Sequence, residues 1–182
     1  MLKNFKYKYG FKKLQAEFCS SVGKTIVTNL SNAKSIGIIY DATTTDNFEK
    51  IKVFVNELRS NIPEIIAIGY VNQKELDDNH IKPQGFEFFC QKDTNWFHKP
   101  LEQNVIDFTN KPFDILIDFD FNNNLAIKFV VVESKSTFKV GKFESSQNDF
   151  YDLTLNINKD QEDPLSYFIE QVKVYLNMIK TS

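Results

Sequence analysis

The chain has 182 residues, of which 42% are hydrophobic and 25% charged, a composition typical of a globular protein with one buried core. A formal net charge of −2 argues against a general binder of nucleic acid, which needs a basic surface. The chain contains no apolar run of 18 residues that would predict a membrane span, and no apolar core of a signal peptide near its start. The two cysteines form no CxxC pair. These features favour a cytoplasmic location.

Residues 1–33 predict a basic helical segment. Six lysines face one glutamate in residues 1–24, a charge of +5 that leaves −7 for the rest of the chain. The first residues also alternate as a strand would, but Leu14, Phe18 and Val22 follow a helical step, so we expect a helix over residues 11–22 with an irregular or helical lead-in. This segment could cover the core, mediate a homo-oligomer, or meet an anionic partner or membrane surface. A solvated lysine-rich face is the simplest interpretation.

The next elements alternate between strand and helix. Residues 35–40, 64–71 and 86–90 are short, apolar and partly β-branched, which predicts buried strands. Between the first two, apolar residues spaced three and four apart predict a helix from Asp46 to about residue 61. Asp46 with Glu49 three residues later resembles a capping box.

The second half repeats this alternation. We expect a helix over residues 101–110, a strand from Phe113 toward Asp118, a helix over residues 122–133, and strands over residues 137–141 and 151–157. The run Val130–Val132 has high β-propensity and competes with the helix assignment there. Asp163 and Pro164 form an N-cap and first helical position, so the last helix is expected to begin at this pair.

This order of elements predicts an α/β fold: a mainly parallel, doubly wound, Rossmann-like sheet with helices on both faces, joined by right-handed crossovers. Residues 34–182 would form this single domain, preceded by the basic segment of residues 1–33. In such sheets, ligands bind at the carboxyl ends of the strands, where the strand order reverses.

Four residues at predicted carboxyl ends of strands are the candidate ligand-binding residues: Asp41, Thr43, Asp118 and Asp120. Neighbouring carboxylates there could bind Mg²⁺ or act as an acid–base pair. Aspartates also commonly accept hydrogen bonds from loop amides and helix N-termini, which is the commoner role. The threonines of residues 43–45 could hold a phosphate at a helix N-terminus, although plain N-capping is the simpler interpretation.

The remaining motifs predict no cofactor, metal or catalytic residue. Neither GxGxxG, GxxxxGK[ST] nor GxSxG occurs, and the two histidines, His80 and His98, have no zinc-ligand spacing. Cys90 and His98 could in principle form a nucleophile–base pair, but Cys90 lies in an apolar run and is expected to be buried. Lysines 135, 139 and 142 could receive a phosphate or carboxylate, or form a solvated edge.

The segment from Phe113 to Asp118, with the later run Ser134–Gly141, resembles an uncharacterised bacterial family found mainly in Bacteroidota and known only as a domain of unknown function. The same segment is similar to the amino-terminal half of heptosyltransferase-like glycosyltransferases, through Asp114, Asp118 and Gly141. That similarity implies a Rossmann-like fold. The Gly-rich loop of those enzymes is missing, and we expect the chain to be too short for their second domain.

The sequence therefore favours a non-catalytic binding or interaction domain. The alternative is an enzyme, or the remnant of one, acting on a nucleotide sugar or a phosphorylated small molecule.

Overall fold

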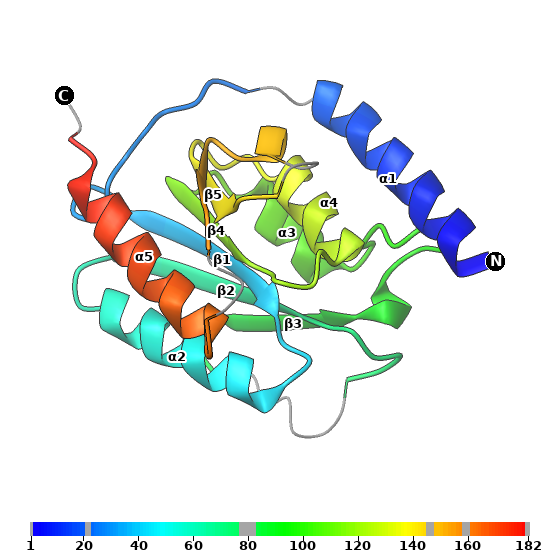
Figure 1. The fold of residues 1–182 in the computed structure, drawn as a ribbon, viewed down its shortest axis with the longest axis horizontal. Coiled ribbons are helices and arrows are strands. Elements are labelled where there is room, and N and C mark those ends of the chain that lie inside the picture. The colour runs from blue at the N-terminus through cyan, green and yellow to red at the C-terminus, as the bar shows by residue number, and fades with distance from the viewer. Residues whose placement is uncertain (1, 21–22, 77–82, 145–147, 158–160, 181–182) are drawn as a thin grey trace.

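The structure, a computed structural model, describes residues 2–20, 23–76, 83–144, 148–157 and 161–180. In chain order its elements are α1 (Leu2–Ser20), β1 (Ser35–Asp41), α2 (Thr45–Leu58), β2 (Glu64–Val71), β3 (Phe86–Cys90), the 3₁₀ turn η1 (Gln91–Asp93), α3 (Gln103–Asn110), β4 (Ile115–Phe119), α4 (Leu125–Glu133), β5 (Lys139–Lys142), the 3₁₀ turn η2 (Asn148–Phe150), β6 (Leu153–Leu155) and α5 (Pro164–Met178). Figure 1 shows them in the order of the chain.

The described strands form one six-stranded sheet in the order β3-β2-β1-β4-β5-β6, and every pair of neighbours is parallel. This confirms the predicted α/β fold class. The chain winds outward in one direction from β1 to β3 and then returns to build the other half from β4 to β6. The strand order therefore reverses between β1 and β4, which is the switch point of this sheet.

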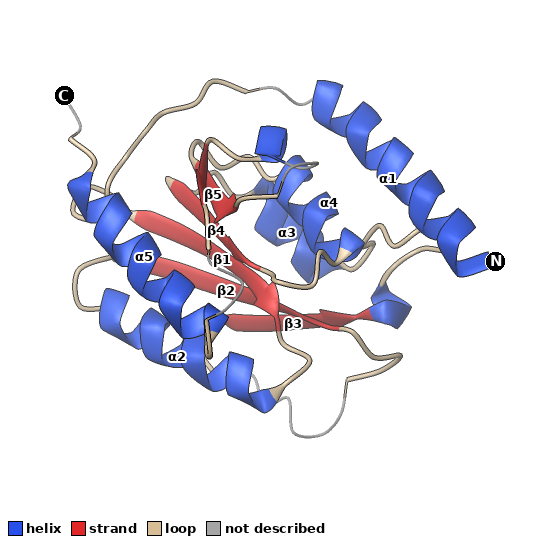
Figure 2. Cartoon of the chain, viewed as in Figure 1, coloured by secondary structure: helices blue, strands red, loops and turns tan. Residues whose placement is uncertain are grey.

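Helices cover both faces of the sheet, as Figure 2 shows. Alternation along each strand divides the core into two clusters. One contains Ile38 and Ile117 and packs against α2 and α5. The other contains Ile39 and Leu116 and packs against α3, α4 and α1.

Helix α4 is buried along almost its whole length. Every residue from Leu125 to Val132 is buried, because the sheet lies on one side of the helix and α1 packs on another. A helix that is apolar all round is stable only when it is covered in this way. The β-propensity of Val130–Val132 is thus overridden by tertiary packing, and the predicted helix is confirmed from residue 125 onward.

Helix α1 begins at Leu2, so the lead-in to the helix expected from residue 11 is itself helical, and its match to the spacing of a strand is incidental. Val22, the expected end of the helix, lies outside the described residues. Leu14 is fully buried against the α4 side of the core. Gly10 permits a close approach, since a Cβ there would lie 2.7 Å from Leu125 Cδ2 and would also clash with the carbonyl oxygen of Phe97.

Two other local predictions need correction. The N-cap of α2 is Thr44, whose side chain accepts a hydrogen bond from the amide of Asn47 at 3.3 Å, so the Asp46–Glu49 capping box is wrong. Asp118 lies inside β4 instead of after it, because β4 continues to Phe119. By contrast, Asp163 caps α5 with Pro164 next to it, as predicted.

The remaining elements keep their predicted type with shifted ends. The helix expected over residues 101–110 begins at Gln103, and the strands expected over residues 137–141 and 151–157 shorten to β5 and β6. Cys90 is fully buried, as expected, whereas Cys19 is exposed, and both are free thiols. Among the described residues, no helix is both long and apolar enough to cross a membrane.

Candidate functional site

The carboxyl ends of β1 and β4 bring the predicted aspartates into one hydrogen-bonded cluster. Asp41 ends β1, Asp118 lies in β4, and Asp120 follows β4, and all three are at least 96% buried. Asn124 connects two of them, because its Nδ2 donates to Asp41 Oδ2 at 3.1 Å and to Asp120 Oδ1 at 2.9 Å. The sequence left open whether these side chains converge; they meet because β1 and β4 are neighbours in the sheet.

Loop amides occupy part of each carboxylate. The amide of Thr43 donates to Asp41 at 2.8 Å, that of Asp120 donates to Asp118 at 2.8 Å, and those of Asn122 and Asn124 donate to Asp120 at 2.9 and 2.6 Å. These are the local turn contacts that aspartates commonly make after a strand. These hydrogen bonds hold the loop between β4 and α4 in place at the switch point of the sheet.

Thr43 has a structural role in the loop after β1. Its hydroxyl oxygen accepts a hydrogen bond from the amide of Asn72 at 2.9 Å, which ties the ends of β1 and β2 together. The threonine run holds Thr44 as the N-cap of α2, which agrees with the simpler of the two roles considered for it. Participation of Thr43 in ligand binding stays a prediction.

Lys128 and Tyr151 complete the cluster on the α4 side. Lys128 Nζ donates to Asp118 Oδ2 at 2.7 Å and to the Tyr151 hydroxyl oxygen at 2.9 Å, and the Tyr151 hydroxyl donates to the same Asp118 oxygen at 2.6 Å. Asp120 lies 3.8 Å from the ammonium. The lysine is 4% exposed and therefore depends on these partners for its charge to be tolerated.

Burial and the neighbouring charges shift the pKa values of the groups in this cluster. Burial raises the pKa of the Asp120 carboxyl; the nearby Lys128 ammonium opposes that shift and Asp118 adds to it. Burial lowers the Lys128 pKa, but the neighbouring acids outweigh it, so its pKa lies above the ordinary lysine value and the lysine stays charged. Burial also raises the pKa of Tyr151 well above its usual value, which keeps the hydroxyl protonated and able to donate to Asp118.

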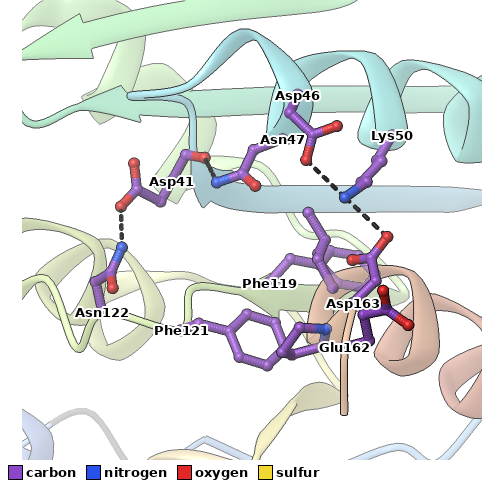
Figure 3. Close-up of a pocket in the computed structure, with 11 residues that line it drawn as sticks. Asp41, Asp46, Asn47, Lys50, Phe119, Phe121, Asn122, Glu162 and Asp163 are labelled. Carbon is purple, nitrogen blue, oxygen red and sulfur yellow. Dashed lines mark hydrogen bonds and ion pairs between the residues drawn. The ribbon is translucent and has the colours of Figure 1, made fainter.

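A cavity of about 470 Å³ opens beside the cluster, between the N-termini of α2 and α5. Figure 3 shows Asp41, Asn47 and Asn122 on one side of it, with Lys50 bridging Asp46 and Asp163 on the other. Asn122 Nδ2 donates to Asp41 Oδ2 at 2.7 Å. Phe119 and Phe121 form the apolar part of the cavity wall. Of the four predicted residues, Asp41 lines this cavity, whereas Thr43, Asp118 and Asp120 are absent from its wall.

The wall of the cavity is acidic. Among the described residues of the wall, Asp41, Asp46, Glu162 and Asp163 contribute four carboxylates against the one ammonium of Lys50. Two of these acids lie at helix N-termini. Asp163 caps α5 by accepting from the amide of Ser166 at 3.2 Å, and Asp46 lies in the first turn of α2, whose N-cap is Thr44. A hydrogen bond from Lys50 is the main cause that lowers the pKa of Asp163, which therefore stays ionised at neutral pH.

The other sequence candidates do not join this cluster. His98, with positive φ, lies in the loop after β3, and Cys90 donates its thiol to the Lys74 carbonyl at 3.5 Å within the core. Burial raises the pKa of Cys90, which opposes a role as a thiolate nucleophile. The neighbouring Trp96 and Phe97 pack on Tyr9 of α1, so this loop lies against the N-terminal helix. In the part of the chain that is described, no three His, Cys, Asp or Glu residues are arranged to hold a metal ion.

Residues 3–179 match the model of a family described as a family of unknown function (DUF6913). The chain belongs to this family. The match includes α1 from its second residue as well as the whole sheet. No curated protein and no solved structure matches the chain.

Proposed function

We propose that this DUF6913 chain is a non-catalytic binding domain that holds a small polar molecule in the cavity beside Asp41. The observation that carries the proposal is the position of this cavity at the carboxyl ends of β1 and β4, where the strand order reverses. Parallel α/β sheets bind their ligands at this point because the loops there diverge and leave a crevice.

The charge of the cavity wall indicates the chemical class of the ligand. The described residues of the wall, four carboxylates and one lysine, repel a phosphate. The helix N-termini that would otherwise attract one are already capped, α5 by Asp163 and α2 by Thr44. A neutral or cationic compound with hydroxyl or amino donors matches Asp41, while Phe119 and Phe121 offer surface for its apolar part.

The hydrogen bonds within the aspartate cluster support a binding role over a catalytic one. Asp118 is held by Lys128 and Tyr151, and Asp120 by two loop amides, so both carboxylates face partners within the protein. A general base needs to reach a substrate proton within hydrogen-bond distance. Asp41 also accepts hydrogen bonds from Thr43, Asn122 and Asn124, but it lines the cavity, and its Oδ1 accepts only one of these bonds. Because a carboxylate oxygen has two lone pairs, Oδ1 can accept a further hydrogen bond from a ligand.

One observation favours a second candidate, an enzyme acting on a nucleotide sugar or a phosphorylated small molecule. The pKa of Asp120 is raised by burial, and Asn124 connects this carboxyl to Asp41 at the cavity wall. Raised carboxyl pKa values are typical of general acids. The acidic wall disfavours a phosphorylated substrate, so this candidate ranks second.

A thermal-shift panel tests both candidates. It compares neutral sugars, amines and polyamines with nucleotides, nucleotide sugars and sugar phosphates, on the wild type, Asp41→Asn and Asp107→Asn. Asp107 is the matched control, because it lies on exposed α3 and pairs with Gln103 on the same helix. A ligand at 100 times its dissociation constant stabilises by about 2.7 kcal/mol, which raises Tm by roughly 5–10 °C in a domain of this size.

A neutral or cationic hit that Asp41→Asn abolishes and Asp107→Asn retains would support the binding proposal. A phosphorylated hit that is chemically converted would replace it with the enzyme. A panel with no shift would contradict both candidates at this cavity.

The location and assembly of the chain remain parts of this proposal. A cytoplasmic location agrees with its free cysteines, Cys19 and Cys90. Self-association through α1 is supported by the exposure of Phe5 and Tyr7, which are 63% and 40% exposed. Sedimentation of the wild type and a Phe5→Ser, Tyr7→Ser variant would test this, because loss of a dimer on substitution is the expected result.

A further inference from the structure

A second cavity, of about 600 Å³, lies away from the switch point, where α4 ends and β5 begins. Its wall combines the linker after α1, the turn between α4 and β5, and the segment that leads into β6. Hydroxyl groups of Thr25, Ser134 and Ser136 and the side chain of Lys139 line it. The proposed function makes no use of these residues.

We propose that this cavity binds a small anionic carbonyl compound, such as a 2-oxo acid, which forms an imine with Lys139 Nζ. Lys139 is the first residue of β5, and its half-buried side chain lies on the α4 side of the sheet. This inference is independent of the ligand proposed for the cavity beside Asp41.

The contacts of Lys139 leave its nitrogen able to react. Nζ donates one hydrogen bond, to the Val132 carbonyl at 3.3 Å, and makes no ion pair with any described residue. A neutral amine can keep this hydrogen bond through one N–H and still present its lone pair to the cavity. Burial lowers the pKa of Lys139 to about 8, so a substantial fraction of this amine is neutral near physiological pH.

The charged groups around Lys139 divide into two sets. The nearby acids are already engaged: both oxygens of Asp152 accept hydrogen bonds, one from the amide of Lys139 and one from Thr25, and Glu133 pairs with Lys99. Asp149 is exposed at the rim. Lys24 and Lys135, both exposed, have no ion pair with a described residue and can receive the anionic group of the ligand.

The reaction balances without an external oxidant or reductant. The amine lone pair attacks the carbonyl carbon, the C=O pair moves onto oxygen, and a proton passes from nitrogen to that oxygen. Loss of the oxygen as water, with the second amine proton, leaves the C=N bond of the imine. The hydroxyl of Ser136 lines the same cavity as the amine and can donate a hydrogen bond to the departing oxygen.

Reductive trapping tests the proposal on the full chain. The protein is treated with pyruvate and sodium cyanoborohydride at pH 8, and peptide mass spectrometry follows the modification of each lysine with time. At pH 8 about half of an amine with a pKa of about 8 is neutral, against less than about 1% of an ordinary lysine. We expect Lys139 to be modified at least about tenfold faster than Lys92, an exposed lysine of η1 that does not line this cavity and serves as the internal control.

Three comparisons decide the outcome. Lys139→Arg keeps the positive charge and should remove the fast site, while its circular dichroism spectrum stays that of the wild type. Acetone, which lacks the carboxylate, should react more slowly than pyruvate, and a Lys24→Met, Lys135→Met variant should lose this preference. Equal rates at Lys139 and Lys92 would overturn the imine, and equal rates with acetone and pyruvate would overturn the anionic ligand class.

Discussion

Replacement of Lys128 by Met should strongly destabilise the fold. The lysine is 4% exposed and contacts Asp118 at 2.7 Å, Tyr151 at 2.9 Å and Asp120 at 3.8 Å. Met fills a similar volume in the apolar surroundings of α4, so the main effect is to leave two buried carboxylates without their cation. Breaking a buried ion pair from one side costs about 3–5 kcal/mol. For a domain of this size, that corresponds to a fall in Tm of roughly 6–20 °C.

Urea denaturation followed by circular dichroism measures this change. Lys52→Met is the matched control, because Lys52 makes an exposed pair with Glu49 one turn away on α2. Such surface pairs contribute about 0–1 kcal/mol, so the control should leave the free energy of unfolding almost unchanged. Adding Asp118→Asn to Lys128→Met should recover stability, because it removes one of the two orphaned charges.

A loss below about 1 kcal/mol, or one no larger than that of Lys52→Met, would refute this reasoning. A double variant less stable than Lys128→Met alone would refute it as well, since Asp118 would then stabilise the fold without its cation.

Two further predictions follow from the same structure. Because the pKa of Asp120 is raised in the folded state, the folded protein holds this proton more tightly than the unfolded chain does. The resulting stabilisation is fully present below pH 3.8, the unfolded pKa, and is lost as pH rises through the folded pKa. The stability of the wild type relative to Asp120→Asn, from urea titrations between pH 4 and 8, should therefore fall as pH increases; a flat difference would contradict the raised pKa. Gly10→Ala should lower Tm by a few degrees, although Ala is the better helix former by about 1 kcal/mol, because its Cβ would lie 2.7 Å from Leu125. A higher Tm would show that α1 does not pack closely on α4.

The sheet was largely predictable because its strands are buried on both faces. Residues 64–71 and 86–90 read as short apolar runs bounded by polar turns, and β2 and β3 have the same bounds in the structure. The N-terminal helix was harder to predict from the sequence, because Phe5, Tyr7, Tyr9 and Phe11 follow the two-residue spacing of a strand. The packing of this helix depends on contacts that are distant in the chain: Tyr9 packs on Phe97, 88 residues later, and Gly10 approaches Leu125 of α4, 115 residues later.

The aspartates of the candidate site were predictable from their position after strands, but their partners were not. Asp41 and Asp120 meet through Asn124, and this contact requires β1 and β4 to be neighbours, which the order of elements alone does not determine. Tyr151 reaches Asp118 from a segment 33 residues later because β6 follows β5 in the sheet. No local pattern marks a pairing that long-range topology creates.

Lys128, however, carried a signal in the sequence. It is the single charged residue between Leu125 and Val132, in a helix with no polar face, so its ammonium cannot reach solvent and needs a buried carboxylate partner. Aspartates at the end of the preceding strand are natural partners, because a helix that packs back on a parallel sheet faces the strand it follows. A lone lysine in such a helix, close after an Asp-x-Asp strand end, therefore predicts a buried ion pair between helix and sheet. Where neither aspartate precedes the lysine, the same physical argument predicts that the helix will not be fully covered.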